Sequence, residues 1–196
     1  AAIDEAIRNA VAVGADPRNL AMLDNFCWPS VDDEQTLGTL VRTCEACYDV
    51  AKAYGVPFIS GKDSLHNQFT DSETGRVTRI PNTLLISTIG VIEDVRKCIT
   101  MDLKKPGDSV WLVRPRSSEL PILASVHRVL AAAIDRGYVR ACHDVSDGGV
   151  LTAAAEMCIA SGLGMSIFNP HDGETDWLFA ERLASYLVEL PKDDFA

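Results

Sequence analysis

The sequence predicts an α+β chain made of two units that join near residue 106. Apolar residues at helical spacing alternate along the chain with short apolar, β-branched runs of strand length. The stretch Lys104 to Asp108 combines charge, proline and glycine, which is typical of a boundary between units. With 196 residues, 47% of them hydrophobic and 23% charged, the composition suits one large globular domain or two small ones.

The first unit is predicted to span residues 1–105. Ile3, Ile7 and Val11 recur at helical spacing, and Gly14 ends that helix. Strands are expected over residues 20–24, 56–60 and 83–92. A second helix begins near the acidic residues 32–34 and reaches about residue 54. The polar stretch 71–79 is predicted to be an exposed loop or hairpin.

The second unit is predicted to span residues 106–196. It begins with a strand over residues 109–113 and a helix over 119–135, followed by a third apolar run at 139–142. A helix over about 150–160 comes next, and strands are expected near 165–168 and at 186–190.

Charge and hydropathy exclude several classes of partner. The formal net charge of −10 argues against nucleic acid, because phosphate backbones are bound by clustered Lys and Arg. No apolar run approaches the roughly 20 residues that a membrane helix needs, and no signal peptide is visible. The six cysteines lie mostly in apolar stretches, which favours thiols in a reducing cytoplasm. Because the first residues read as a helix already under way, we expect a piece of a longer polypeptide.

The first cluster of polar residues, Gly61, Lys62, Asp63 and Ser64, follows an apolar run. Glycine lets the backbone approach a ligand, lysine supplies charge for phosphate, Asp suits a hard metal ion, and Ser offers a hydroxyl. The spacing is not that of a P-loop. A tight turn whose Asp and Ser bond the local backbone explains the same residues equally well.

The second cluster, His143 to Gly149, follows a strand and leads into a helix. Its two glycines expose backbone N–H groups beside the positive end of the helix, where phosphate binds well. Asp144 is a candidate Mg²⁺ ligand and Ser146 a candidate phosphate contact. The alternative is that Ser146 or Asp147 only caps the next helix.

Two weaker candidates come from the N-terminal part. Glu5 and Asn9 are four residues apart and so share one helix face, where an oxygen pair suits Mg²⁺. A solvated helix face explains this pair more simply. Asp24 ends the strand predicted over residues 20–24, and it is as easily a turn-former as a ligand.

Four stretches together resemble the phosphoribosylformylglycinamidine synthase family: GVPFISGKDSLHN, LDNFCWP, IPNTLLISTIGVIEDV and ACHDVSDGGVLTAAAEM. HDVSDGGV alone indicates the wider superfamily typified by aminoimidazole ribonucleotide synthetase (PurM-like). The resemblance implies a ferredoxin-like α+β N-terminal domain that lacks its first strands. An incomplete α/β PurM C-terminal-like domain would follow. It also implies that the chain is the second half of a two-part synthetase core.

The resemblance implies ATP-dependent amidation of formylglycinamide ribonucleotide with glutamine-derived ammonia, a step of purine biosynthesis. By position in the family's motifs, Asp24 and Gly61 would contact ATP, Lys62 the phosphate region and Ser64 the substrate. A charged lysine cannot ligate Mg²⁺, so a phosphate contact suits Lys62 better. The family's catalytic residues match no position in this chain.

A second set of residues resembles a non-catalytic nucleotide site of the family's large, single-chain form. Glu5, Asn9 and Asp144 would hold Mg²⁺ there, and Ser146 would touch ATP or ADP. Implied partners are the first half of the core, a glutamine amidotransferase domain or subunit, or a second copy of the chain. Two alternatives remain: a nucleotide-holding structural half, or another PurM-like enzyme of the selenophosphate synthetase or thiamine-monophosphate kinase type.

Overall fold

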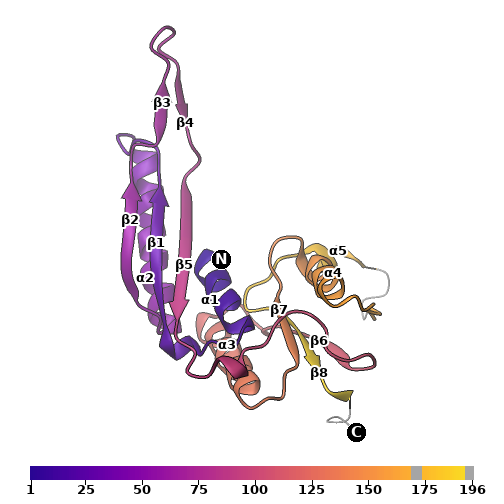
Figure 1. The fold of residues 1–196 in the computed structure, drawn as a ribbon. Coiled ribbons are helices and arrows are strands. Elements are labelled where there is room, and N and C mark those ends of the chain that lie inside the picture. The colour runs from indigo at the N-terminus through magenta and orange to yellow at the C-terminus, as the bar shows by residue number, and fades with distance from the viewer. Residues whose placement is uncertain (169–173, 193–196) are drawn as a thin grey trace.

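A three-stranded sheet backed by a long helix forms the first half of the chain, in a computed structural model that describes residues 1–168 and 174–192. Strand β1 lies in the middle of this sheet, parallel to β2 and antiparallel to β5 (Figure 1). In chain order the elements are α1 (Ala2–Ala12), the 3-10 turn η1 (Pro17–Asn19), β1 (Leu20–Cys27), α2 (Glu34–Tyr54), β2 (Phe58–Ser64) and β5 (Thr83–Gly90).

Helix α2 covers one face of the sheet. Met22 and Phe26 of β1 point toward it and share a buried core with Cys47 and Tyr54 of the helix. The helix begins where the acidic residues predict, because the Asp33 carboxylate accepts a hydrogen bond from the Thr36 N–H at 2.8 Å.

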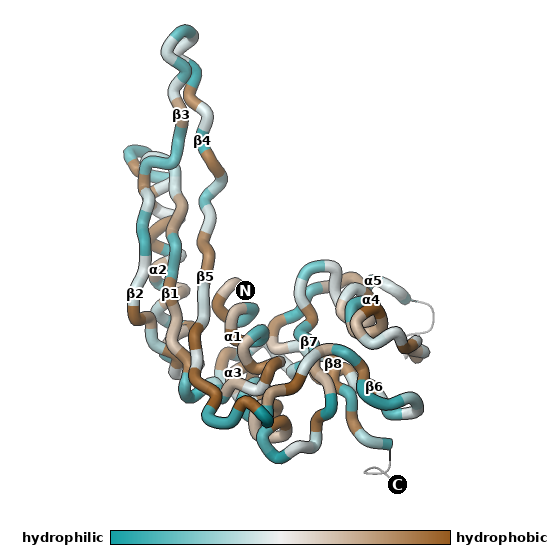
Figure 2. Tube along the Cα trace, viewed as in Figure 1, coloured by the Kyte–Doolittle hydropathy of each residue, from teal (hydrophilic) through white to brown (hydrophobic). Residues whose placement is uncertain are grey.

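The opposite face of the sheet is open. Leu85 and Ile89 of β5 point to this side and are 53% and 58% exposed. Figure 2 shows hydrophobic positions along β1 and β5. Leu85 and Ile89 therefore form an exposed apolar pair on the open face of the sheet.

A narrow hairpin, β3 (Gln68–Thr70) and β4 (Val77–Arg79), extends beyond the end of the sheet (Figure 1). The Asp71 carboxylate holds its turn by accepting hydrogen bonds from the N–H groups of Glu73 and Thr74. The prediction of an exposed loop or hairpin over 71–79 is confirmed as a hairpin.

A second sheet, in the order β6–β8–β7 and wholly antiparallel, forms the other half. Helix α4 packs on this sheet, and α3 packs back against α1 and α2 of the first half. The elements are η2 (Val95–Lys97), β6 (Ser109–Val113), α3 (Leu120–Asp135), β7 (Ala141–Asp144), α4 (Gly149–Ser161), α5 (Asp176–Phe179) and β8 (Tyr186–Leu190). In the described ranges, no helix is both long and apolar enough to span a bilayer.

A buried polar network joins the two halves around Asp4 of α1. Its carboxylate accepts hydrogen bonds from the Tyr54 hydroxyl (2.7 Å), His127 Nε2 (3.0 Å) and the Ala184 N–H (2.9 Å). Burial would raise the pKa of Asp4, but His127, Ala184 and Tyr54 together hold it below its usual value. An ionised, fully bonded carboxylate therefore fixes α1 against the second sheet.

The predicted boundary segment is held by a buried acid. Glu189 of β8 is 1% exposed, and its carboxylate accepts hydrogen bonds from the N–H groups of Lys104 and Lys105 at 2.8–3.0 Å. The chain between the two sheets is thus tied to the second sheet. The division at residues 105 and 106 itself stays a prediction.

One predicted strand is wrong. Residues 165–168 are irregular instead of extended against a neighbour. Met165 packs over the face of the second sheet, beside Val110 and Leu112, so it joins the core without pairing with an edge strand. Ile167 and Phe168 are 41% and 85% exposed, so only part of the apolar run is buried.

Candidate functional site

The first predicted cluster lies inside a strand and does not form a turn. Gly61 to Ser64 are the last four residues of β2, because β1 runs alongside and pairs with each of them. Asp24 pairs with Gly61 in the middle of β1, so the prediction that Asp24 ends a strand is also wrong. Both strands continue further than their apolar runs because each supplies hydrogen-bond partners to the other.

Asp24 and Gly61 lie on the face covered by α2. A Cβ atom on Gly61 would stand 2.0 Å from Oδ1 of Asp24, so only glycine leaves room for that carboxylate. Burial and the nearby Asp63 carboxylate raise the pKa of Asp24, and the Lys62 N–H partly offsets them. The glycine therefore makes space for an acid.

Lys62 and Ser64 lie on the opposite, open face of the same sheet. The Lys62 ammonium donates a hydrogen bond to the Ser64 hydroxyl at 2.5 Å. Side chains alternate between the two faces of a sheet, so Asp24 and Gly61 form one pair on the covered face, and Lys62 and Ser64 form another on the open face. Because β2 is an edge strand, one ligand would reach both pairs only across its free edge.

The second cluster is compact and largely buried. Asp144 ends β7, is 6% exposed, and its carboxylate accepts a hydrogen bond from the Ser146 hydroxyl. His143 lies 3.3 Å from the same carboxylate through Nδ1, and its Nε2 lies 2.7 Å from Glu156 of α4. Burial raises the pKa of Asp144, but His143, the Ser146 hydroxyl and the Arg8 charge together lower it by more. The net shift is downward, so the carboxylate is ionised.

Two glycines shape the turn from β7 into α4. Gly148 and Gly149 have φ angles of 80° and 71°, in the left-handed region that favours glycine. The N-cap position is Gly148, and no side chain caps the helix. The interpretation of Ser146 or Asp147 as a cap is therefore wrong, and the Ser146 hydroxyl is oriented by Asp144 instead.

Glu5 and Asn9 lie on α1 at the edge of its buried stripe. The Asn9 amide nitrogen donates to the Glu5 carbonyl at 3.0 Å, which leaves the amide oxygen available to a cation. Helix α1 packs against β7, and its buried Arg8 lowers the pKa of Asp144. The structure thus brings the helix of Glu5 and Asn9 beside the strand that ends at Asp144. A shared site for the three side chains stays a prediction.

These oxygen donors are of the kind that Mg²⁺ prefers: two carboxylates and an amide, with Asp144 already ionised. Across the described residues, no three His, Cys, Asp or Glu side chains gather as a metal cluster. A site here would therefore need oxygens from a nucleotide's phosphates as well. Such sharing is usual for Mg²⁺.

The sequence did not reveal Arg8 and Glu156 as parts of this site. Arg8 is fully buried one helical turn after Asp4. The available signal for its burial was a charged residue between Ile7 and Val11, two members of the predicted apolar face of the helix. Glu156 lies two turns into α4 and so returns to the side of the loop. Both depend on long-range packing that no local pattern specifies.

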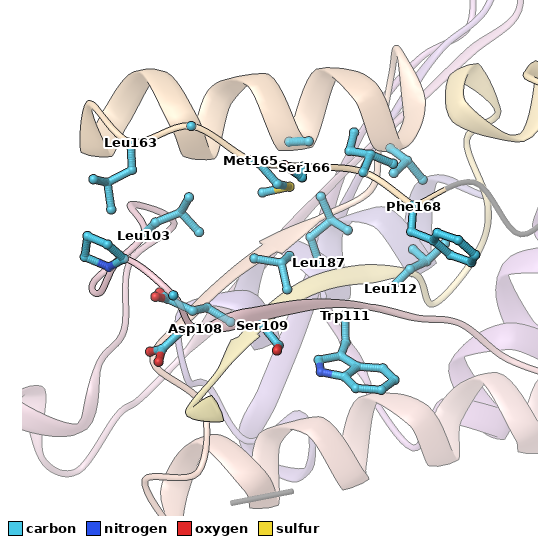
Figure 3. Close-up of a pocket in the computed structure, with 18 of the residues that line it drawn as sticks. Leu103, Asp108, Ser109, Trp111, Leu112, Leu163, Met165, Ser166, Phe168 and Leu187 are labelled. Carbon is cyan, nitrogen blue, oxygen red and sulfur yellow. The ribbon is translucent and has the colours of Figure 1, made fainter. Parts of the chain in front are cut away.

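A large cavity lies elsewhere, between the second sheet and the chain that follows α4. It measures about 840 Å³ and is mostly apolar, with Leu112, Leu187 and Met165 along its walls (Figure 3). None of the predicted site residues lines it. At one edge of the cavity, Asp108 pairs with Arg140 at 2.8 Å.

Two family models match the chain in order. Residues 1–91 match the N-terminal domain of AIR synthase related proteins, and residues 103–194 match the C-terminal domain. A curated relative, phosphoribosylformylglycinamidine synthase subunit PurL of Prochlorococcus marinus (strain MIT 9313), is 30% identical over 97% of this chain. The chain spans 28% of that relative's length.

Solved structures show the same fold at lower identity. PurL of T. maritima complexed with ATP superposes with a TM-score of 0.63 at 17% identity, over 98% of this chain and 32% of its own. A chain of the HypE–HypF complex also gives 0.63, at 18% identity, over 99% of this chain and 69% of its own. These structures support the fold alone.

Proposed function

This chain belongs to the AIR synthase-related (PurM-like) family, and from that premise we propose that it is the second half of the synthetase core of a phosphoribosylformylglycinamidine synthase. The supporting observation is the 30% identity to a PurL subunit, which runs through both domains in order. The whole enzyme would join formylglycinamide ribonucleotide and glutamine-derived ammonia at the expense of ATP, in the cytoplasm. This chain would supply binding groups to that reaction and none of its catalytic residues.

In the proposed reaction, the amide oxygen of the ribonucleotide attacks the γ-phosphorus of ATP and ADP leaves. Ammonia then attacks the activated carbon, and phosphate leaves to give the amidine. Lys62 would place its ammonium against the transferring phosphate, and Ser64 would donate to the substrate. Asp24 of the central strand β1 and its neighbour Gly61 of the edge strand β2, on the face that α2 covers, would contact ATP.

The second set of residues would hold a nucleotide that is not consumed. Glu5, Asn9 and Asp144 would ligate Mg²⁺, and Ser146 would turn its hydroxyl proton from Asp144 to the nucleotide's phosphate. When bound, Mg²⁺ neutralises phosphate charge. Arg8 and His143 would keep Asp144 ionised and oriented. In this part of the molecule the chain acts as a nucleotide-holding structural half.

The open sheet face indicates where the first half of the core would pack. Leu85 and Ile89 are exposed there beside Lys62 and Ser64, so a domain that covers the apolar residues would also enclose the proposed substrate groups. A glutamine amidotransferase domain or subunit would deliver ammonia to that enclosure. In isolation the same face would pair with a second copy of the chain.

One observation favours a second candidate. The chain covers 69% of a HypE–HypF complex chain but only 32% of the T. maritima PurL chain, at the same TM-score. Another PurM-like ATP-dependent enzyme, of the selenophosphate synthetase or thiamine-monophosphate kinase type, is therefore the alternative. Such an enzyme would share the fold and the ATP chemistry but act on a different small substrate.

The deciding experiment measures ADP release by the full-length protein with ATP and one acceptor at a time. We expect release with formylglycinamide ribonucleotide plus ammonium, and none with selenide or thiamine monophosphate. Formation of the amidine, followed by mass spectrometry, should match ADP mole for mole. ADP release with selenide or thiamine monophosphate, and none with the ribonucleotide, would exclude the synthase.

A further inference from the structure

An arginine-lined cavity of about 820 Å³ opens between the loop after β6 and the segment before β8. It is separate from the apolar cavity of Figure 3, although Arg114 borders both. We call it the arginine pocket, and its walls are formed by Arg114, Pro115, Arg116, Ser117, Ser118, Leu123, Glu181, Arg182 and Leu183.

Positive charge predominates in the arginine pocket. Arg114, Arg116 and Arg182 line it, although the whole chain carries a net charge of −10. Among the described residues of its wall, the carboxylate belongs to Glu181, which accepts a hydrogen bond from the fully buried Arg8 guanidinium at 2.7 Å. Arg8, which also pairs with Asp4 at 3.3 Å, thus offsets part of the negative charge of the wall.

The three wall arginines have no counter-ion of their own. Across residues 1–168 and 174–192, none of their guanidinium groups lies within ion-pair distance of a carboxylate. Like charges held around one concavity repel one another. An anion that enters the pocket would relieve that repulsion, so the excess charge favours an anionic ligand.

Neutral donors stand beside the arginines. The Ser117 hydroxyl accepts a hydrogen bond from the Glu119 N–H at 3.3 Å, so its own proton is free to donate outward. Ser118 is exposed next to it. These hydroxyls precede α3, a helix of 16 residues whose positive end faces the same loop.

We propose that the arginine pocket binds the phosphate group of a small molecule, through Arg114, Arg116 and Arg182 with help from Ser117. Guanidinium groups match phosphate because two N–H donors meet two oxygens in one plane. Nucleic acid does not fit a chain of net charge −10, because phosphate backbones are bound by a large excess of Lys and Arg.

The position of the pocket suggests its use. Arg114 and Arg182 also border a narrow gap lined by Val145 and Ser185, and Val145 follows Asp144 in the β7–α4 loop. A phosphorylated ligand in the arginine pocket would therefore lie next to the proposed nucleotide site without using its magnesium ligands. This site goes beyond the proposed function, since it needs neither Mg²⁺ nor the purine substrate.

Calorimetry on the full-length protein in EDTA tests this site, because chelation removes magnesium-dependent nucleotide binding. Inorganic phosphate, ribose 5-phosphate and ADP are titrated separately. In the variant Arg114→Gln/Arg116→Gln, we expect at least tenfold weaker binding of whichever phosphate compounds the wild type binds. The matched control is Arg128→Gln/Arg136→Gln, which removes two exposed arginines outside the pocket, one on α3 and one at its C-cap, and should change affinity less than twofold.

Each result has a defined meaning. Failure of the wild type to bind any of the three compounds, or equal losses in both double variants, would overturn the site. The compound whose affinity falls most in the pocket variant identifies the natural source of the phosphate. If the double variant does not fold, Arg116→Gln alone should weaken binding at least threefold, and unchanged binding overturns the site.

The test also separates this site from the proposed function. Asp144→Asn should weaken binding of Mg²⁺·ADP yet leave phosphate binding in EDTA unchanged. Arg114→Gln/Arg116→Gln should weaken phosphate binding in EDTA and leave binding of Mg²⁺·ADP unchanged. Loss of both activities in Asp144→Asn would show one merged site and overturn an independent phosphate pocket.

Discussion

The strand end Gly61–Ser64 and the loop His143–Gly149 carry similar polar residues, yet the structure treats them differently. In the loop, Asp144 is 6% exposed, ionised and already bonded to Ser146. In the strand, Lys62 is exposed and its ammonium donates a hydrogen bond to Ser64. The loop is preorganised by its own chain, whereas the strand end presents groups to whatever covers the sheet.

Neighbouring elements explain the difference. The loop is enclosed by α1, α4 and α5. The α5 backbone comes close to the loop because residue 149 is glycine: a Cβ atom there would lie 2.5 Å from the carbonyl carbon of Phe179. Strand β2 has a partner on one side only. A binding site held by three elements should depend on its network for stability, and an edge strand should affect activity more than folding.

Asp144→Asn should give the largest effect. It leaves Arg8 and His143 facing a neutral amide in a buried setting, which should cost about 3 kcal/mol of unfolding free energy. It should also abolish the rise in Tm that Mg²⁺·ADP gives the full-length wild-type protein. Thermal unfolding with and without Mg²⁺·ADP measures both effects.

The control for this variant is Asp147→Asn, an exposed acid three residues further along the same loop. It should unfold as the wild type does and keep its response to nucleotide. If Asp144→Asn keeps the full nucleotide-induced rise in Tm, the loop does not hold the nucleotide, and preorganisation there serves folding alone.

Gly61→Ala should have the next largest effect, on stability. The new methyl would overlap the Asp24 carboxylate, which stands 2.0 Å from the Cβ position, and the strain should cost about 2 kcal/mol. Adding Asp24→Ala should recover part of that loss, because the overlapping group is gone. Urea unfolding of the single and double variants measures this coupling.

Gly38→Ala provides the comparison for a glycine without such a neighbour. Its nearest contact would be the end of the Arg42 side chain at 3.4 Å, within helix α2, so alanine should be neutral or stabilise by up to about 1 kcal/mol.

Additive losses for Gly61→Ala and Asp24→Ala would show that the two residues are not coupled through space.

Sequence periodicity predicted nearly all of the fold. The strand at 186–190 and the helix ending at residue 54 were predicted with the observed limits, since apolar spacing and caps are local signals. The strands ending at Cys27 and Ser64 were predicted too short, because pairing with a neighbour extended them through polar residues. Pairing is a property of the folded chain.

The candidate site was less accessible to sequence reasoning. Residue types and spacing singled out Asp144 and Ser146, and their position between β7 and α4 is correct, whereas their roles as ligands stay predictions. Which face each β2 residue occupies required the register with β1, since a shift of one residue reverses every side chain. Arg8 reaches Glu181 across 173 positions, and no sequence pattern reports a contact of that range.

Lys62→Met tests the exposed side of the comparison. Loss of the ammonium should lower kcat/KM for ribonucleotide-dependent ADP release at least tenfold, about 1.4 kcal/mol, with Tm unchanged. Ser64→Ala should lower it similarly if the hydroxyl contacts the substrate. Lys52→Met, an exposed lysine on α2, is the control and should leave the rate unaltered. Unaltered kinetics in both Lys62→Met and Ser64→Ala would remove the strand end from the active site.

The smallest expected effect is a pH dependence of the loop's own stability in EDTA. Contact with Asp144, opposed by burial and aided by Glu156, raises the pKa of His143 above its usual 6.5. A raised folded-state pKa means that this stabilisation is complete below about pH 6.5 and is lost as pH rises through the folded-state value. The lowered pKa of Asp144 has the opposite consequence: the stabilisation from its carboxylate is complete above the usual pKa of 3.8 and is lost as pH falls from there through the folded-state pKa.

The unfolding free energy of the wild type should therefore decline by about 0.5 kcal/mol between pH 6 and 8.5, since Glu156 is half exposed and solvent screens part of the interaction. His143→Gln should remove that decline, because the neutral amide does not titrate. His66→Gln, at an exposed histidine of the β2–β3 turn, should keep it. A decline of equal size in His143→Gln would place the titrating group elsewhere, and the buried loop would then owe its rigidity to Asp144 and Ser146 without the imidazole.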